Sequence, residues 1–138
     1  MGFWSFLFGE RTRVEDKYFG DERLFKPTSK VIGLGISGKL PGLTTAQKEF
    51  YRQVEENYLA LIPGIQKLIT AKVRNWKPDF TIQDFTKEFW PVYLSIPAIE
   101  KKEKELEWEI AFETFHDQNH TFTIYMKGFL PDYVHIDG

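Results

Sequence analysis

The stretch VIGLGISGKLPGLTTAQ, residues 31–47, decides the fold because it joins a strand pattern directly to a helix start. Its bulky apolar residues alternate along an extended chain: Ile32, Leu34 and Ile36. Gly33 and Gly35 fall on the opposite side, where a residue without a side chain admits a close neighbour. We therefore expect a strand with one core face and one glycine face.

The glycines of this stretch also match two nucleotide-binding motifs by spacing. Residues 33–38 fit G-x-G-x-x-G, and residues 33–40 fit all but the last position of G-x-x-x-x-G-K-[ST]. Both motifs hold phosphate by opening directly into a helix. Here Pro41 follows instead, and Leu40 has no oxygen to offer magnesium. We expect a strand at this position and no nucleotide site.

The second half of the stretch begins a long helix. Thr44 with Gln47 forms a capping-box pattern, so we expect the helix to start at Thr45 and to run to about Val73. Its apolar residues recur at helical spacing on one face: Phe50, Val54, Tyr58, Leu61, Ile65 and Leu68. Pro63 removes a backbone donor inside this pattern, so we expect a kink or two nearly coaxial helices.

The segments on either side of this helix favour shorter elements. Residues 16–37 are expected to hold two or three strands, interrupted at residues 20–21 and by a turn at residues 27–29. After the long helix, Thr81 is expected to cap a short helix that continues through Phe89. Residues 92–96 alternate as a strand.

The last part of the chain alternates between apolar and polar residues. Four apolar residues share one strand face, Leu106, Trp108, Ile110 and Phe112, while glutamates occupy the other. Residues 122–126 and 132–137 continue the strand pattern. The run at residues 100–105 is balanced in sign, which is typical of a solvated hairpin loop.

Together these segments predict an α+β fold, with a mostly antiparallel sheet packed against a long Pro-kinked helix and a short second helix. N-terminal strands and a C-terminal meander make up the sheet. The length predicts a single domain, residues 1–138, with residues 1–13 as a loosely attached aromatic segment. The expected core is Ile32, Leu34, Phe50, Val54, Leu61, Leu68, Trp108, Ile110, Phe112, Phe122 and Ile124.

The composition excludes several functional classes. The chain has no cysteine, so it has no disulfide, thiolate zinc site or cysteine nucleophile. A formal net charge of −2 gives no global electrostatic reason to expect nucleic-acid binding. No serine lies in a G-x-S-x-G motif. These observations favour a protein that is not an enzyme.

The N-terminal segment is aromatic and then basic. Phe3, Trp4 and Phe8 precede Arg11 and Arg13, in a run that is too short to span a bilayer and lacks a secretory signal pattern. We expect a cytoplasmic protein without a transmembrane segment. The aromatic residues either rest on a membrane surface or a partner, or pack on the protein's own core.

The two histidines at residues 116 and 120 suggest a hairpin tip. A three-residue loop at residues 117–119 would match the apolar faces of the flanking strands. This register places His116 opposite His120, and it also pairs two further sets of residues across the hairpin, Phe112 with Ile124 and Glu109 with Lys127.

Two imidazoles facing each other across a hairpin are close enough to share a metal ion. A divalent metal site built on His116 and His120 would need a third or fourth ligand, for which the tail offers His135, Asp132 and Asp137, with His135 as the leading candidate. The alternative is that the histidines finish an apolar face and hydrogen-bond to the turn. No other cofactor is expected.

The outer face of the glutamate-rich strand carries four carboxylates: Glu105, Glu107, Glu109 and Glu113. An open strand face gives paired carboxylates little reason to differ in pKa, so we expect no catalytic residue among them. They form either a solvated face or an acidic patch that attracts a basic partner.

The order of these segments resembles a group of small bacterial α+β domains of unknown function, some of which look like immunity proteins that neutralise a toxin. The resemblance covers residues 18–138 and rests on a T-x-x-Q helix start and a C-terminal hairpin with a D-x-E-H-G turn. Gln47, Asp117 and His120 match the recurrent positions, whereas Asn119 and Thr121 stand where the group often has Glu and Gly.

The resemblance implies binding to another protein and no established reaction. With the acidic strand face, it predicts a non-catalytic protein-binding module of the toxin-immunity type. The alternative prediction is a metal-binding module or metal-dependent enzyme built on the histidine pair.

Overall fold

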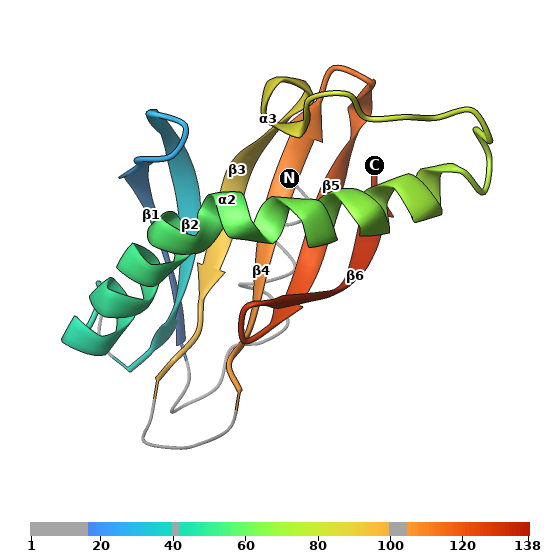
Figure 1. The fold of residues 1–138 in the computed structure, drawn as a ribbon. Helices are drawn as coiled ribbons and strands as arrows, with labels where there is room; N and C mark the ends of the chain where they lie inside the picture. The colour runs from blue at the N-terminus through green and yellow to red at the C-terminus, as the bar shows by residue number, and fades with distance from the viewer. Residues whose placement is uncertain (1–16, 40–41, 100–104) are drawn as a thin grey trace.

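The fold is a six-stranded sheet with a long helix across one of its faces (Figure 1). The computed structural model describes residues 17–39, 42–99 and 105–138. Within them the elements follow one another as β1 (Lys17–Phe25), β2 (Lys30–Gly38), α2 (Thr45–Val73), α3 (Phe85–Glu88), β3 (Phe89–Ile96), β4 (Glu107–Thr114), β5 (Asp117–Lys127) and β6 (Leu130–Asp137). This arrangement confirms the α+β class.

In space the strands follow their order in the sequence, from β1 at one edge to β6 at the other. Neighbours are antiparallel except for β2 and β3, which run parallel. A parallel pair needs a long crossover connection, and α2 provides most of it. The helix thereby brings the N-terminal hairpin beside the C-terminal meander in one sheet, a parallel junction that the sequence analysis did not predict.

The start of α2 is fixed by the predicted capping box. Thr44 Oγ1 accepts a hydrogen bond from the Gln47 backbone N–H at 3.1 Å, and Gln47 Oε1 accepts one from the Thr44 N–H at 3.0 Å. Gln47 is buried, and its Nε2 donates to Ser37 O at 2.7 Å and to Pro97 O at 2.9 Å. One amide therefore joins the helix start to the chain at the ends of β2 and β3.

The helix α2 extends from Thr45 to Val73 with Pro63 inside it. It ends where the amphipathic pattern predicted. A kink at Pro63 stays a prediction. At Gly64 the helix approaches β6 closely, because an added Cβ would lie 3.1 Å from Pro131 Cγ.

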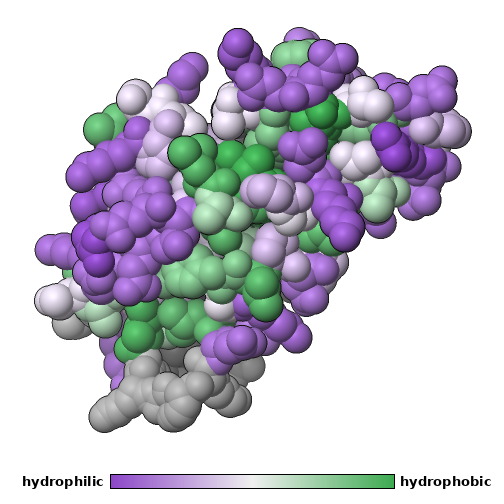
Figure 2. Space-filling view, viewed as in Figure 1, coloured by the Kyte–Doolittle hydropathy of each residue, from purple (hydrophilic) through white to green (hydrophobic). Residues whose placement is uncertain are grey.

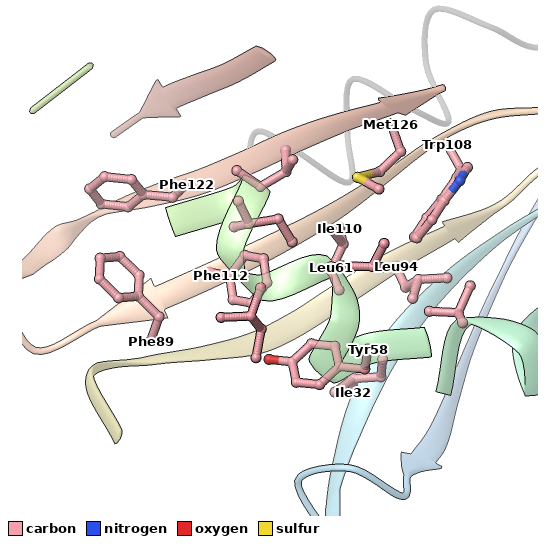
Figure 3. Packing of buried hydrophobic residues seen from close by; sticks show 14 of the residues in the cluster. Ile32, Tyr58, Leu61, Phe89, Leu94, Trp108, Ile110, Phe112, Phe122 and Met126 are labelled. Atoms are coloured by element: carbon pink, nitrogen blue, oxygen red, sulfur yellow. The ribbon is translucent and has the colours of Figure 1, made fainter. Parts of the chain in front are cut away.

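The core lies between α2 and the sheet (Figure 3). Strand residues such as Leu94 and Ile110 point toward Leu61 of the helix. All the predicted core residues are buried except Leu68, which is partly buried against the core. Aromatic rings fill the ends of this layer, with Phe50 packed edge-on against Trp108 and Phe85 stacked on Phe89.

Three predicted boundaries were wrong. The strand β1 is continuous through residues 20–21, because each of its residues pairs with β2 across the turn at residues 26–29. The short helix begins at Phe85 after the N-cap Asp84, not after Thr81, because the Asp84 side chain accepts from the Thr86 N–H. Phe89 is already the first residue of β3.

The surface on the helix side is mixed. Figure 2 shows hydrophilic residues grouped over the N-terminal part of α2, with hydrophobic residues showing beside them. Among the described residues, no helix combines the length and the apolar character that crossing a membrane requires.

Candidate functional site

The candidate site lies on the face of the sheet that points away from α2; we call it the helix-free face because neither of the two helices in the described residues lies on it. Tyr93 and Ala111 form a small buried cluster there with Val92, separate from the main core. The neighbouring residues Leu94 and Ile110 belong to the core on the other face. Period-two alternation in β3 and β4 thus produces two different environments from the same strands.

A close contact between Gly35 and Tyr93 organises this face. Gly35 in β2 is paired with Gly20 in β1 and with Ser95 in β3. An added Cβ on Gly35 would lie 1.9 Å from the Tyr93 hydroxyl oxygen and 2.9 Å from Cζ. The tyrosine side chain can lie over β2 only because position 35 has no side chain. The predicted glycine face therefore exists, and Tyr93 is its close neighbour.

Beside Tyr93 the face is hollowed, with a cavity of 680 Å³ that opens to solvent. Tyr18 of β1, Ser37 of β2 and Ser95 of β3 are among the residues that line it. The Ser95 hydroxyl is held in place, because its Oγ accepts a hydrogen bond from the Glu109 backbone N–H at 2.7 Å.

The hollow is acidic. Among the described residues, its lining includes Glu107, Glu109 and Asp132 together with the ammonium group of Lys127. Lys127 lies directly across from Glu107, where opposite charges stabilise a strand pair. The described part of the lining, with three carboxylates and one lysine, therefore has an excess of negative charge.

The four glutamates of the β4 region are not equivalent. Glu105, Glu107 and Glu113 are exposed, as predicted for a solvated face. Glu109 is only partly exposed, and its Oε1 atom is shielded from solvent, as is the Tyr93 hydroxyl. The carboxylate of Glu109 is therefore partly withdrawn from solvent, while the other three carboxylates are accessible to solvent or to a partner.

Two tyrosines form an aromatic platform at the far side of the hollow. Tyr125 of β5 and Tyr133 of β6 are cross-strand neighbours whose rings stack with centroids 4.5 Å apart and planes 8° from parallel. Tyr133 is 52% exposed, so one ring of the stack faces solvent. Stacked rings beside carboxylates suit a cationic side chain, which is attracted by both.

Burial changes the acidity of the tyrosines on this face. It raises the pKa of Tyr125 to about 12, and the charges of Glu109, Tyr133 and Asp137 add to the effect. Burial also raises the pKa of Tyr93, with further contributions from Glu109 and Tyr18. Both hydroxyls are therefore neutral near pH 7.

The predicted register of the β4–β5 hairpin was wrong. Phe112 lies opposite Phe122, not Ile124, and Glu109 lies opposite Tyr125, not Lys127. The turn falls at Phe115 and His116, because Thr114 already pairs with Asp117 across an irregularity in β4. His116 and His120 are consequently not cross-strand partners.

Each histidine of the hairpin instead contacts its own carboxylate. His116 Nε2 lies 2.6 Å from Glu88 Oε1, and His120 Nδ1 lies 2.7 Å from Asp117 Oδ2. Glu88 is buried, and its Oε2 accepts from the backbone N–H groups of Gln83 and Asp84. The Glu88 side chain therefore ties the segment before α3 to the hairpin.

These contacts set the acidity of both carboxyl groups. Burial alone would raise the pKa of Glu88, but hydrogen bonds from the Asp84 backbone, His116 and the Gln83 backbone lower it. The hydrogen bond with His120 lowers the pKa of Asp117 and outweighs the opposing effect of burial. Both groups are held as carboxylates.

The third predicted metal ligand lies elsewhere. His135 is exposed on β6, opposite Thr123. Within residues 17–39, 42–99 and 105–138, no three histidine or acidic side chains gather closely enough to hold a metal ion. The metal hypothesis stays a prediction.

Three other sequence predictions concern residues outside the described part of the chain. They are the aromatic segment with Phe3, Trp4 and Phe8, the Leu40–Pro41 end of the phosphate-loop pattern, and the charged loop at residues 100–105, of which only Glu105 is described.

Sequence reasoning missed most of the helix-free face. It singled out the glutamates but not Tyr93, Tyr125, Tyr133 or Ser95. The alternation in residues 92–96 was a signal that could have found Tyr93 and Ser95, since both fall on the side opposite Leu94 and Ile96.

Comparison with known proteins adds no assignment: the chain matches no family model, no curated protein and no solved structure.

Proposed function

We propose that this protein is a non-catalytic protein-binding module whose helix-free face binds a basic surface of another protein. The observation that carries the proposal is the exposed carboxylate row of β4 beside the acidic hollow. Glu107 and Glu113 are exposed along this strand, Glu105 is exposed just before it, and the hollow is bordered by the Tyr125–Tyr133 stack.

The chemistry of this face supports recognition of Lys or Arg side chains. Exposed carboxylates attract a basic partner and orient it during encounter. Tyrosine provides a large contact area at a small cost in side-chain entropy, which is why it is enriched at protein interfaces. Tyr133 combines this property with an exposed ring face that can stack on a guanidinium group.

The proposed module is of the toxin-immunity type, acting in the bacterial cytoplasm by covering a basic surface of a toxin. The support for this finer assignment is the resemblance of the T-x-x-Q helix start and the C-terminal hairpin to immunity-like bacterial domains. Structurally, Gln47 of that motif is a buried joint between α2 and two strands, so its role in this chain is to build the fold.

Affinity capture from the source organism tests the proposal. The bait is compared with a variant neutralised on the proposed face, E107Q/E113Q, and with a control neutralised on α2 and the loop after it, E56Q/D79N. Both variants lose two negative charges at exposed positions. We expect a basic protein to be retained by the wild type and the control and to be depleted with E107Q/E113Q. Failure to recover any specific partner, or equal recovery by both variants, contradicts the proposal.

A further inference from the structure

A smaller cavity lies beside the β4–β5 turn. It has a volume of 260 Å³. Pockets for drug-sized molecules typically measure about 300–1,000 Å³, so this cavity suits a group the size of one side chain or one headgroup. The described residues that line it are Trp90, Glu113, Thr114, Phe115, Asp117 and Gln118.

One wall of this cavity is a cross-strand pair. Trp90 of β3 lies directly opposite Glu113 of β4. The next pairs along the two strands contain Phe89 and Phe112, which face the core. Because successive side chains of a strand point to opposite faces, Trp90 and Glu113 share the helix-free face. Directly paired residues have Cβ atoms about 4.5–5.5 Å apart, so an indole ring lies beside a carboxylate here.

The β4–β5 turn supplies a second aromatic ring. Phe115 comes two residues after Glu113 and is 54% exposed, so the cavity is reached from solvent at this ring. The ring packs against His116, with centroids 4.6 Å apart. The backbone N–H of His116 donates to Thr114 Oγ1 at 3.1 Å, which fixes the turn. A large apolar side chain is thus held at the surface next to Trp90 and a carboxylate.

The charged residues among the described lining are both acidic. Glu113 is exposed. The oxygens of Asp117 already take part in hydrogen bonds, because Oδ1 accepts from the Asn119 backbone N–H at 3.1 Å and Oδ2 lies 2.7 Å from His120 Nδ1. Lys77 also interacts with Asp117 and offsets part of its charge. Glu113 therefore provides most of the negative charge that the cavity offers to a ligand.

We propose that this cavity binds a quaternary ammonium group, with the rings of Trp90 and Phe115 against its methyl groups and Glu113 as the opposing charge. An aromatic ring attracts a cation to its face, and indole does so most strongly. A quaternary ammonium group has no N–H to donate, so it needs no hydrogen-bond acceptors beyond those that the turn already uses. Choline and the trimethyllysine side chain share this chemistry. The inference does not rest on the proposed protein partner.

Titration of the ¹⁵N-labelled full chain tests the proposal, with choline and a short trimethyllysine peptide as parallel probes. We expect saturable shifts of the Trp90 indole N–H signal and of the Glu113 and Phe115 amide signals. The Trp108 indole N–H, which donates to Gly128 O at 2.7 Å, is the internal reference and should not shift. The probe that binds more tightly identifies the source of the group.

A neutral analogue of choline, in which a tert-butyl group replaces the trimethylammonium group, separates charge from shape. It should produce no saturable shift at the same concentrations. Equal binding of the neutral analogue overturns the proposal, as does the absence of saturable shifts at Trp90 with both probes. Shifts centred on Tyr133 in place of Trp90 would assign the cation to the acidic hollow and also overturn it.

Variants at exposed positions test the named residues without disturbing the core. Phe115→Ala and Glu113→Gln should each weaken the affinity for the tighter probe about two- to fivefold, the effect of one cation–π contact or ion pair at a partly exposed site. The matched controls are Trp76→Ala, in the loop after α2 and 51% exposed, and Glu56→Gln on α2. They should leave the affinity unchanged, and equal weakening by variants and controls contradicts the proposal.

Discussion

Gly35 and Tyr93 fit together so closely that a Cβ on the glycine would lie 1.9 Å from the tyrosine hydroxyl oxygen. The two residues come from the parallel strands β2 and β3, which α2 brings side by side. Their contact therefore depends directly on the junction between the N-terminal hairpin and the C-terminal meander.

Gly35→Ala should destabilise the protein by about 1–3 kcal/mol, the usual cost of overpacking, because the Tyr93 ring has to move. Gly38→Ala is the matched control on the same strand, since nothing lies within 4 Å of its added Cβ. Urea unfolding followed by circular dichroism measures both. In the Tyr93→Ala background the Gly35→Ala penalty should largely disappear, and a penalty that is unchanged there would show that the contact is not its cause.

Gln47→Ala should cost roughly 2 kcal/mol or more, because it removes half of the capping box and leaves the carbonyls of Ser37 and Pro97 without this donor. Gln53→Ala serves as the control, because the side chain of this glutamine in the same helix donates to the exposed side chain of Glu49. Thermal unfolding of the two variants compares them. Similar melting temperatures would contradict the joint role assigned to Gln47.

Stability should fall as the pH drops below about 4.5, the ordinary pKa of a glutamic acid side chain. The pKa of Glu88 is lowered in the folded state, so its contribution is present above the unfolded pKa and is lost as the pH falls through the folded pKa. Asp117 acts in the same direction. Glu88→Gln should reduce stability near neutral pH and make stability fall less steeply as the pH drops. Asp79→Asn, at an exposed position of the loop after α2, should leave stability near neutral pH unchanged.

Zinc, nickel or manganese should not raise the melting temperature. His116 and His120 are not cross-strand partners, and among the described residues no three histidine or acidic side chains gather closely enough to hold a metal ion. Thermal melts with each metal, combined with elemental analysis of the purified protein, make the measurement. A clear stabilisation by one of the three metals, abolished by His116→Ala, would support the metal-binding alternative instead.

The sequence was sufficient where one local pattern determined the outcome. The strand with Ile32 and Leu34, the capping box at Thr44 and the amphipathic stripe of α2 each followed from neighbouring residues. The junction of β2 with β3 did not, because parallel pairing is decided by where a long helix places two distant segments.

The β4–β5 hairpin is the clearest case in which the sequence alone did not predict the structure. Face matching sets the strand register only to within steps of two residues, and an irregularity in one strand changes the length of the loop, so different turns satisfy the same apolar pattern. The sequence favoured a loop at residues 117–119, whereas Glu88 from a distant segment binds His116 within the actual turn. The hollow could not be predicted from the sequence for the same reason, because its lining residues come from all six strands.

Association kinetics of the captured partner test the central claim, that the exposed carboxylates of β4 orient a basic protein on the helix-free face. The association rate constant is measured against ionic strength for the wild type, E107Q/E113Q and E56Q/D79N. We predict a rate that falls with added salt, is lower for E107Q/E113Q and depends less on salt there, with E56Q/D79N like the wild type. A rate independent of salt, or one that the two double variants lower equally, would contradict the account.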